Sequence, residues 1–253
     1  GWHRSVLFNQ VVVEPEHGAR TYLPIVGYRT VHKGPALWLL AGVHGEEPAG
    51  PMAFARNVDF VASLAQAGVP VVAVFMCNPK GYYLDWRYPN EKRNWRVGRS
   101  ATESDHLMLH LEYPNRPRVD EPATPEAYAI TNFVLDWMEE YPPILELDAH
   151  EDEADLTAQV ARYEMFQTYC YVISSLGFDD PVARKVAGIL AANGIPLQRD
   201  GVTRFGEQIV GGMVVPDEGE GSIDELFCAE WIVRDGVLRP KPAAKCSIVT
   251  ETP

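Results

Sequence analysis

Short apolar runs that alternate with stretches of helical periodicity set the strongest limit on the fold. Two stretches, 51–67 and 124–140, space their apolar residues three to four apart, and Asp180-Pro181 opens a further helix that Gly194 closes. The strand-like runs, rich in β-branched residues, occupy 5–13, 36–41, 69–77, 144–147, 169–174 and 246–250. This alternation predicts a single α/β domain over residues 1–253, with a mixed, largely parallel twisted sheet and helices on both faces.

Polar side chains cluster where these predicted strands end. His44, Asn78, His150 and Glu251 each fall at, or just after, the end of an apolar run. Ligands of open α/β sheets bind beyond the carboxyl ends of the strands, so the four positions predict one site. Two long polar segments, 78–121 and 198–221, interrupt the pattern, and loops of that length in a compact domain are typically functional or mobile.

The segment His44-Gly-Glu46-Glu47-Pro directly follows the apolar run 36–41. An imidazole and a carboxylate three residues apart can both reach one metal ion, and His150 offers a third ligand. Three protein ligands leave a fourth position for water, as in catalytic zinc sites. Glu46 is the rival to Glu47, but His-x-Glu is the spacing of zinc deaminases, whose Pro-Cys-x-x-Cys partner the sequence lacks.

Metal-assisted hydrolysis also needs a base and a cation beside the developing oxyanion. Glu251 ends the apolar run 246–250, although an acid near a terminus is also commonly a simple surface group. Several arginines lie close together in one loop of an otherwise acidic protein and are candidates for this cation. The alternative interpretation is that they form an ordinary solvent-exposed surface. These arginines are Arg87, Arg93, Arg96 and Arg99.

Composition excludes several partners. The formal net charge of −13 argues against nucleic acid and anionic membranes. No apolar run approaches the roughly 20 residues that span a bilayer. The N-terminal residues show no basic start followed by an apolar middle, and four widely spaced cysteines without a Cys-x-x-Cys pair fit a cytoplasmic location.

Six segments in the same order resemble the zinc carboxypeptidase family and its relatives, the succinylglutamate desuccinylases and aspartoacylases. His44-Gly-Glu-Glu47 resembles the His-x-x-Glu zinc motif, and Asp148-Ala-His150 resembles the segment with the third ligand. The other four are Asn78-Pro-Lys-Gly81-Tyr, Arg93-Asn-Trp95-Arg96-Val-Gly-Arg99-Ser100, Gly221-Ser222-Ile223-Asp224 and Thr250-Glu251. The resemblance covers roughly residues 36 to 253 and implies the carboxypeptidase-like (phosphorylase/hydrolase-like) fold.

The resemblance also implies roles for individual residues. His44, Glu47 and His150 would hold one Zn²⁺ per chain, Glu251 would be the general base, and Arg96 would steady the oxyanion. The remaining positions concern the substrate, a peptide or an N-acyl amino acid. Ile223 would make the specificity pocket apolar, and Asn115-Arg116 is the local candidate for binding a terminal carboxylate.

Departures from the family pattern leave the substrate open. Asn115-Arg116 lacks the Asp before it and the aromatic residue after it, and the family's mobile tyrosine has no match where Asp217 and Glu218 stand. Digestive carboxypeptidases also continue with a helix beyond the base, so a shorter member or a trimmed chain is expected. A metallocarboxypeptidase-like peptidase is the first hypothesis, with an N-acyl amino acid amidohydrolase and a non-catalytic binding module as alternatives.

Other enzyme classes have less support. No Gly-x-Ser-x-Gly elbow, Gly-x-Gly-x-x-Gly or phosphate-loop motif occurs. Paired-carboxylate glycoside chemistry stays open, since 35 acidic residues make chance pairs common.

Overall fold

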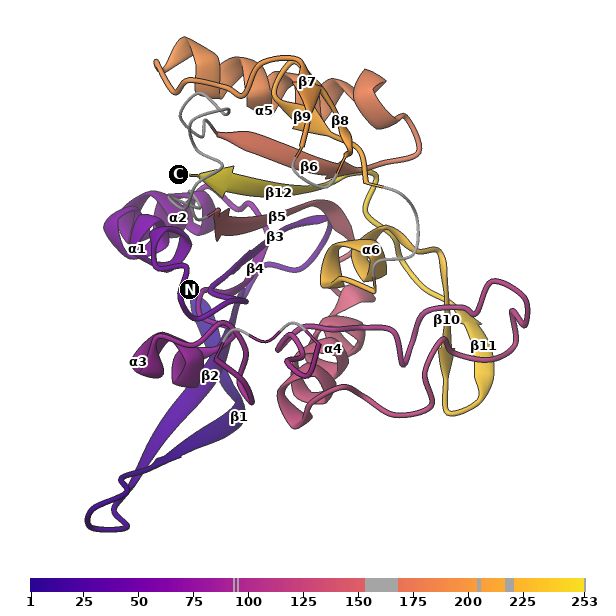
Figure 1. Ribbon diagram of the computed structural model, residues 1–253. Helices are drawn as coiled ribbons and strands as arrows, with labels where there is room; N and C mark the ends of the chain where they lie inside the picture. The colour runs from indigo at the N-terminus through magenta and orange to yellow at the C-terminus, as the bar shows by residue number, and fades with distance from the viewer. Residues whose placement is uncertain (93, 95, 153–167, 204–205, 217–220, 253) are drawn as a thin grey trace.

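The computed structural model describes residues 1–92, 94, 96–152, 168–203, 206–216 and 221–252. In this part of the chain ten strands form one sheet in the order β1-β2-β4-β3-β5-β12-β6-β9-β8-β7, and β10 and β11 form a separate hairpin (Figure 1). The strands are β1 (Trp2–Val13), β2 (Arg20–Thr30), β3 (Ala36–Ala41), β4 (Val71–Val74), β5 (Pro143–Glu151), β6 (Tyr169–Ile173), β7 (Gly201–Val202), β8 (Gln208–Val210), β9 (Met213–Val214), β10 (Trp231–Arg234), β11 (Val237–Pro240) and β12 (Ser247–Thr252). The helices are α1 (Ala49–Arg56), α2 (Val58–Gln66), α3 (Pro79–Leu84), α4 (Pro125–Met138), α5 (Pro181–Ala192) and α6 (Ile223–Cys228), with a 3-10 turn η1 (Gly177–Asp179).

The sheet is mixed, but the prediction that it is largely parallel is wrong. Parallel pairing joins β4, β3, β5 and β12 in the centre and β6 with β9. The other five of the nine neighbouring pairs among the described strands are antiparallel. The strand β2 mixes polar and apolar residues, and the apolar runs of the sequence did not predict it. Because only a short turn joins β1 to β2, the two can pair only as an antiparallel hairpin.

Helices cover both faces of the sheet. Alternate residues of β3 point to opposite faces, so Trp38 and Leu40 belong to one core cluster and Leu39 to another. The first cluster also contains apolar residues of α4 and α6, and the second those of α2. A third cluster packs α5 against Leu145 and Leu147 of β5. The centre of the sheet is therefore enclosed, and its strand ends are held rigidly.

The predicted helices are present, with one difference. The stretch 51–67 forms two helices, α1 and α2, which meet at Asn57. Thr124 caps α4 by accepting a hydrogen bond from the backbone of Ala127, and Asp180 caps α5 in the same way. Proline follows directly after both caps, at a position where its missing N–H costs no intrahelical hydrogen bond.

The register between β5 and β12 positions the functional residues. Glu146, Asp148 and His150 alternate along β5 and therefore share one face of the sheet. The parallel pairing sets Ser247 beside Glu146 and Glu251 beside His150. Two strands, distant in the chain, thus present their polar residues in matched rows.

None of the described helices is long and apolar enough to cross a membrane. The four cysteines, Cys77, Cys170, Cys228 and Cys246, are free thiols.

Candidate metal centre

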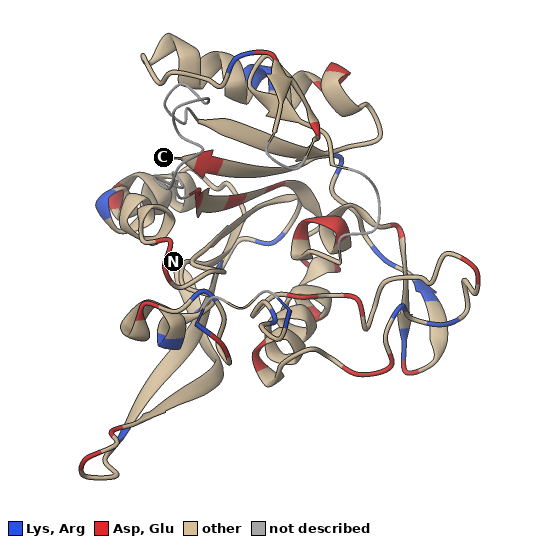
Figure 2. Cartoon of the chain, in the orientation of Figure 1, with Lys and Arg blue, Asp and Glu red and all other residues tan. Residues whose placement is uncertain are grey.

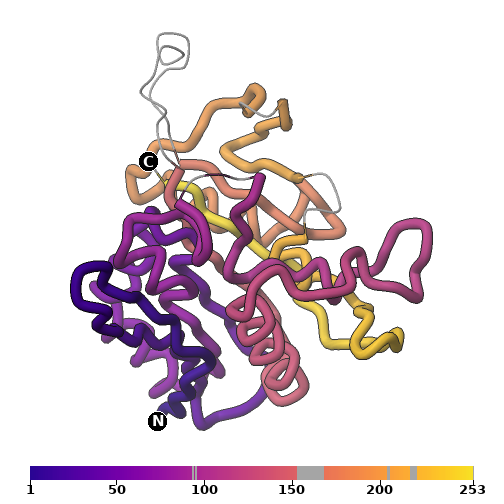
Figure 3. The backbone as a smooth tube through the Cα atoms, turned by 60° about the horizontal axis from the view of Figure 1, so that its bottom comes forward, coloured from indigo at the N-terminus to yellow at the C-terminus, as the bar shows by residue number. Residues whose placement is uncertain are grey.

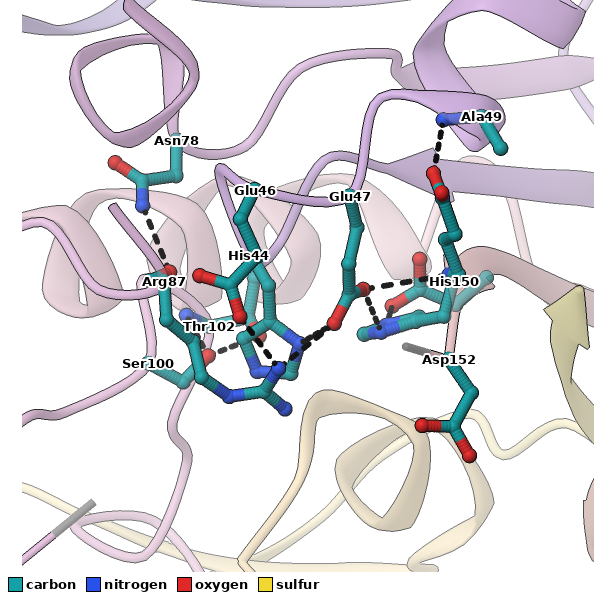
Figure 4. Close-up of polar contacts among 12 residues, drawn as sticks. His44, Glu46, Glu47, Ala49, Asn78, Arg87, Ser100, Thr102, His150 and Asp152 are labelled. Carbon is teal, nitrogen blue, oxygen red and sulfur yellow. Dashed lines mark hydrogen bonds and ion pairs between the residues drawn. The ribbon is translucent and has the colours of Figure 1, made fainter. Parts of the chain in front are cut away.

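Two imidazoles and one carboxylate converge beyond the ends of β3 and β5 (Figure 4). Glu47 lies between the two histidines: its Oε1 is 2.8 Å from Nδ1 of His44, and its Oε2 is 2.9 Å from Nδ1 of His150. The ring centroids of His44 and His150 are 5.0 Å apart. One potential ligand atom from each of the three residues lies within 4.8 Å of the others, as a shared metal ion requires.

Glycine allows the loop that carries His44 and Glu47 to press against its neighbours. A Cβ atom at Gly45 would lie 2.1 Å from the carbonyl carbon of Gly81 in α3. A Cβ atom at Gly50 would lie 2.2 Å from the backbone oxygen of Ala149 in β5. The sequence His44-Gly-Glu-Glu-Pro-Ala-Gly50 thus fixes the loop by close backbone contact as well as supplying the ligands.

A carboxylate behind His150 orients its ring. Nδ1 faces Glu47, whereas Nε2 lies 3.1 Å from Oδ2 of the buried Asp148. Metal-ligating histidines characteristically hold a carboxylate at the nitrogen that does not bind the metal. The donor set, two imidazole nitrogens and one carboxylate, therefore fits a divalent cation of the zinc type.

The charges of the three residues are strongly coupled in the absence of a metal. Burial alone would raise the pKa of Glu47, but His44 and His150 hold that pKa well below its ordinary value. Burial would lower the pKa of His150, yet Asp148 and Glu47 raise it well above the ordinary value. For His44 burial prevails and lowers the pKa. The metal-free centre is thus held together by a protonated His150 beside ionised Glu47.

Arg87 is the arginine that reaches this centre. Its Nη1 is 2.9 Å from Oε1 of Glu47 and 3.1 Å from Oε1 of Glu46 (Figure 4). Its backbone oxygen accepts hydrogen bonds from the backbone of Gly45 and the side chain of Asn78. Arg87 therefore links the loop after α3 to the loop that carries His44 and Glu47, and its charge favours ionised Glu47.

The centre opens into a cavity of about 420 Å³. Sequence motifs did not single out the far wall, which includes Tyr169, Tyr171 and Glu207. The hydroxyl of Tyr169 donates to Asp152 at 2.8 Å, and that of Tyr171 donates to Glu207 at 3.0 Å. The lining residues are His44, Glu47, Arg87, His150, Glu151, Asp152, Tyr169, Tyr171, Ile173, Glu207, Pro216, Ser222, Asp224, Val249 and Glu251.

Glu251 lies on the same wall of the cavity as His150. The pairing of β5 with β12 makes the two residues direct neighbours, and both line the cavity. Burial raises the pKa of Glu251 to about 8; His150 opposes the shift, and Glu47 and Asp152 add to it. Without a metal, this carboxyl group is protonated near neutrality.

The structure does not bring the other predicted residues to the cavity. Arg96 is exposed and is not among the lining residues. Asn115 and Arg116 are exposed in the later part of the α3–α4 connection, which runs beside the β10–β11 hairpin, away from the ends of β5 and β12 (Figures 1 and 3). Ile223 is 1% exposed in the core, so its neighbours Ser222 and Asp224 line the cavity instead.

Part of the pattern quoted from the sequence falls outside the described residues. This applies to Arg93 and Trp95 of the arginine-rich segment, and to Asp217 and Glu218 before α6.

Solved structures share the fold of this chain. A candidate metallopeptidase from Shewanella amazonensis matches with a TM-score of 0.65 and 18% identity, over 100% of this chain and 78% of that one. A second, from Shewanella baltica, matches with a TM-score of 0.62 and the same identity and coverage. A succinylglutamate desuccinylase from Chromobacterium violaceum matches with a TM-score of 0.49 and 14% identity, over 96% of this chain and 64% of that one.

The predicted resemblance to this superfamily is therefore confirmed at the level of the fold. Identities this low establish the fold alone, so the chemistry has to be argued from the residues of the cavity. No protein-family model matches the sequence, and neither does any curated protein.

Removing one imidazole should empty the centre. We expect the chain, loaded with Zn²⁺ and then dialysed, to keep about one ion at this centre, and His150→Ala to keep far less, because two ligands hold zinc much more weakly than three. Elemental analysis of the dialysed protein measures this. His3→Ala, at an exposed histidine of β1, is the matched control. Unchanged zinc in His150→Ala would remove this residue from the ligand set.

Metal uptake should release protons. At pH 7 the metal-free chain carries a proton on His150 and on Glu251, whose pKa is about 8. A cation displaces the proton of His150 and lowers the pKa of Glu251, so the apparent affinity for the cation should rise with pH across the range around 8 in which Glu251 titrates.

Calorimetric titration with Zn²⁺ in buffers of different ionisation enthalpy counts the protons. We expect Glu251→Gln to release about one proton fewer than the parent. Glu139→Gln, at an exposed position, should match the parent. Equal release from the Glu251 variant would show that this carboxyl group is already ionised before the metal binds.

Proposed function

We propose that the protein is a zinc-dependent hydrolase that cleaves a peptide bond, most simply at the C-terminal residue of a peptide. One observation supports this above the others: a His-Glu-His ligand group and a carboxyl group with a raised pKa line the same cavity. The matches with TM-scores above 0.6 are to candidate metallopeptidases, which agrees with the proposal without assigning a substrate.

Different residues of the chain would bind the metal, transfer the proton and orient a ligand. Zn²⁺ bound by His44, Glu47 and His150 would polarise a water molecule and the scissile carbonyl group. Glu251 takes the proton from that water and passes it to the leaving amine. Its position suits this role, since Glu251 lines the cavity directly beside His150 and a base must lie within reach of the proton that it takes. Asp148 keeps the ring of His150 oriented.

Two arginines have separate roles in the proposal. Arg87 contacts Glu47 and acts as a positioning residue whose charge favours the ionised form of this ligand. The role of Arg96 as the group that stabilises the oxyanion rests on the motif alone, and its side chain would have to turn from an exposed position towards the cavity.

The described wall of the cavity favours certain substrates. Carboxylates of Glu207, Asp152 and Asp224 line it, whereas Ile223, expected to make the pocket apolar, packs into the core. Like charges in a confined space repel, so we propose a neutral or basic residue at the leaving side rather than an acidic one. Asn115 and Arg116 stay a motif-based proposal for a terminal carboxylate.

A substrate panel tests the proposed reaction. The zinc-loaded chain is incubated with peptides that end in lysine, leucine, phenylalanine or glutamate, and with N-acyl amino acids. We expect release of the C-terminal residue, fastest for lysine or the apolar residues and slowest for glutamate, as measured by mass spectrometry. Cleavage of acyl amino acids alone would replace the peptidase with the amidohydrolase. No turnover of either class would favour a binding module.

Replacing the base tests the mechanism. Glu251→Gln removes the proton acceptor and keeps the shape, so we expect kcat to fall at least about a hundredfold while zinc content stays at the parent level. Steady-state kinetics on the best peptide and elemental analysis measure both. Glu139→Gln serves as the control. A Glu251 variant as active as the parent would exclude this residue from the chemistry.

A further inference from the structure

Three carboxylates gather in the protein interior directly behind His150. Glu146 and Asp148 come from β5, and Asp224 lies in the first turn of α6 (Figure 2 shows these acidic segments). Glu146 and Asp148 are fully buried, and Asp224 is 5% exposed. One oxygen of each lies within 4.8 Å of the others, the spacing of atoms that share a coordination sphere.

These carboxylates have too few hydrogen-bond donors. The hydroxyl oxygen of Ser247 is 2.5 Å from Oε2 of Glu146 and 3.2 Å from Oδ1 of Asp224, but its single hydrogen can serve only one of them. No described residue donates a hydrogen bond to Oε1 of Glu146 or Oδ1 of Asp148. Buried polar groups almost always have partners, so these two atoms indicate a missing one.

Positive charge is scarce as well. His150, 3.1 Å from Oδ2 of Asp148, is the cation that contacts the cluster, and among the described residues no Lys or Arg forms an ion pair with any of the three acids. Isolated buried charges are costly, and the cost falls when a cation or a proton neutralises them. A proton shared by Glu146 and Asp224 would still leave Oδ1 of Asp148 without a partner.

We propose that Glu146, Asp148, Asp224 and Ser247 form a second cation site, distinct from the His-Glu-His centre and selective for an oxygen-preferring divalent ion of the Ca²⁺, Mn²⁺ or Mg²⁺ class. All the donor atoms are oxygens, which these hard cations prefer, whereas nitrogen ligands favour zinc at the first centre. One divalent ion neutralises most of the charge and supplies the partner that both orphaned oxygens lack.

The site is reached from the cavity. Asp224 lines the cavity wall, as does Val249, which pairs with Asp148 in the register of β5 and β12. Asp148 lies between the two centres: its Oδ2 is at the ring of His150, and one of its oxygens lies within 4.8 Å of Glu146 and Asp224. The second site therefore supports the ligand His150 from behind, and its existence does not depend on the proposed hydrolysis.

Metal-counting on the full chain tests the proposal. The chain is stripped with a chelator, dialysed against Zn²⁺ with Mn²⁺, Ca²⁺ or Mg²⁺, and analysed for bound metal. We expect one zinc and one hard cation in the parent. Glu146→Gln and Asp224→Asn, which keep side-chain shape, should lose the hard cation and keep zinc, whereas His44→Ala should show the reverse. Asp59→Asn, at an exposed position, is the control.

The experiment still tests the second cation site if a variant of one of the buried acids fails to fold. His44→Ala leaves the buried acids intact, so it should still take up Mn²⁺ and gain thermal stability from it. A parent chain that binds zinc alone, together with a His44 variant that binds no Mn²⁺, Ca²⁺ or Mg²⁺, would overturn the proposal and leave the acids to share protons. Loss of peptidase activity has no bearing on either result.

Discussion

The contact of Glu47 with two imidazoles is the interaction on which the site depends. It ties the loop after β3 to the end of β5, and Arg87 anchors it from the loop after α3. Burial disfavours a charged carboxylate, so the structure surrounds Glu47 with positive partners until ionisation prevails. A divalent cation offers the same carboxylate a stronger partner, and the side chains already point at the place where it would bind.

The pairing of β5 with β12 explains why the polar residues of the site lie in successive rows across the two strands. Residues two apart along a strand share a face, so β5 presents His150 at its end, then Asp148 and Glu146 deeper in the sheet. In the same rows β12 supplies Glu251 and Ser247. A shift by one residue would turn all of these groups to the face covered by α5, and the site would be lost. The register is therefore as important as the residues themselves.

Local patterns predicted the parts of the site that are close in sequence or at strand ends. The His-x-x-Glu segment, the candidate ligand His150 and the strand-end Glu251 lie together at the cavity, and each was predicted because it comes at or after the end of an apolar run. Tyr171, Glu207 and Asp224 were not, since they reach the cavity from β6, the loop before β8 and the first turn of α6, whose packing no local spacing reveals. Ile223 was assigned to the pocket by its motif, yet at the start of α6 its neighbours Ser222 and Asp224 line the cavity while Ile223 packs into the core.

The same limit applies to the fold. Apolar runs identified the central strands, where parallel pairs are buried on both faces and the sequence is continuously apolar. The strand β2 is partly exposed and mixes polar with apolar residues, so it contains no apolar run that would predict a strand. Hairpins join the strands at both edges of the sheet and make these pairs antiparallel. The pattern of apolar runs did not reveal these hairpin connections.

Electrostatic balance connects the site to the composition of the chain. With a net charge of −13, the protein places Glu146, Asp148 and Asp224 in the interior between β5 and α6, and among the described residues His150 is the cationic group that contacts them. Arginine and lysine are long and best solvated, so they suit the surface more than a narrow space between strand and helix. A small divalent ion fits such a space and carries more charge per volume. This charge balance is the physical reason for the second cation site that we propose between β5 and α6.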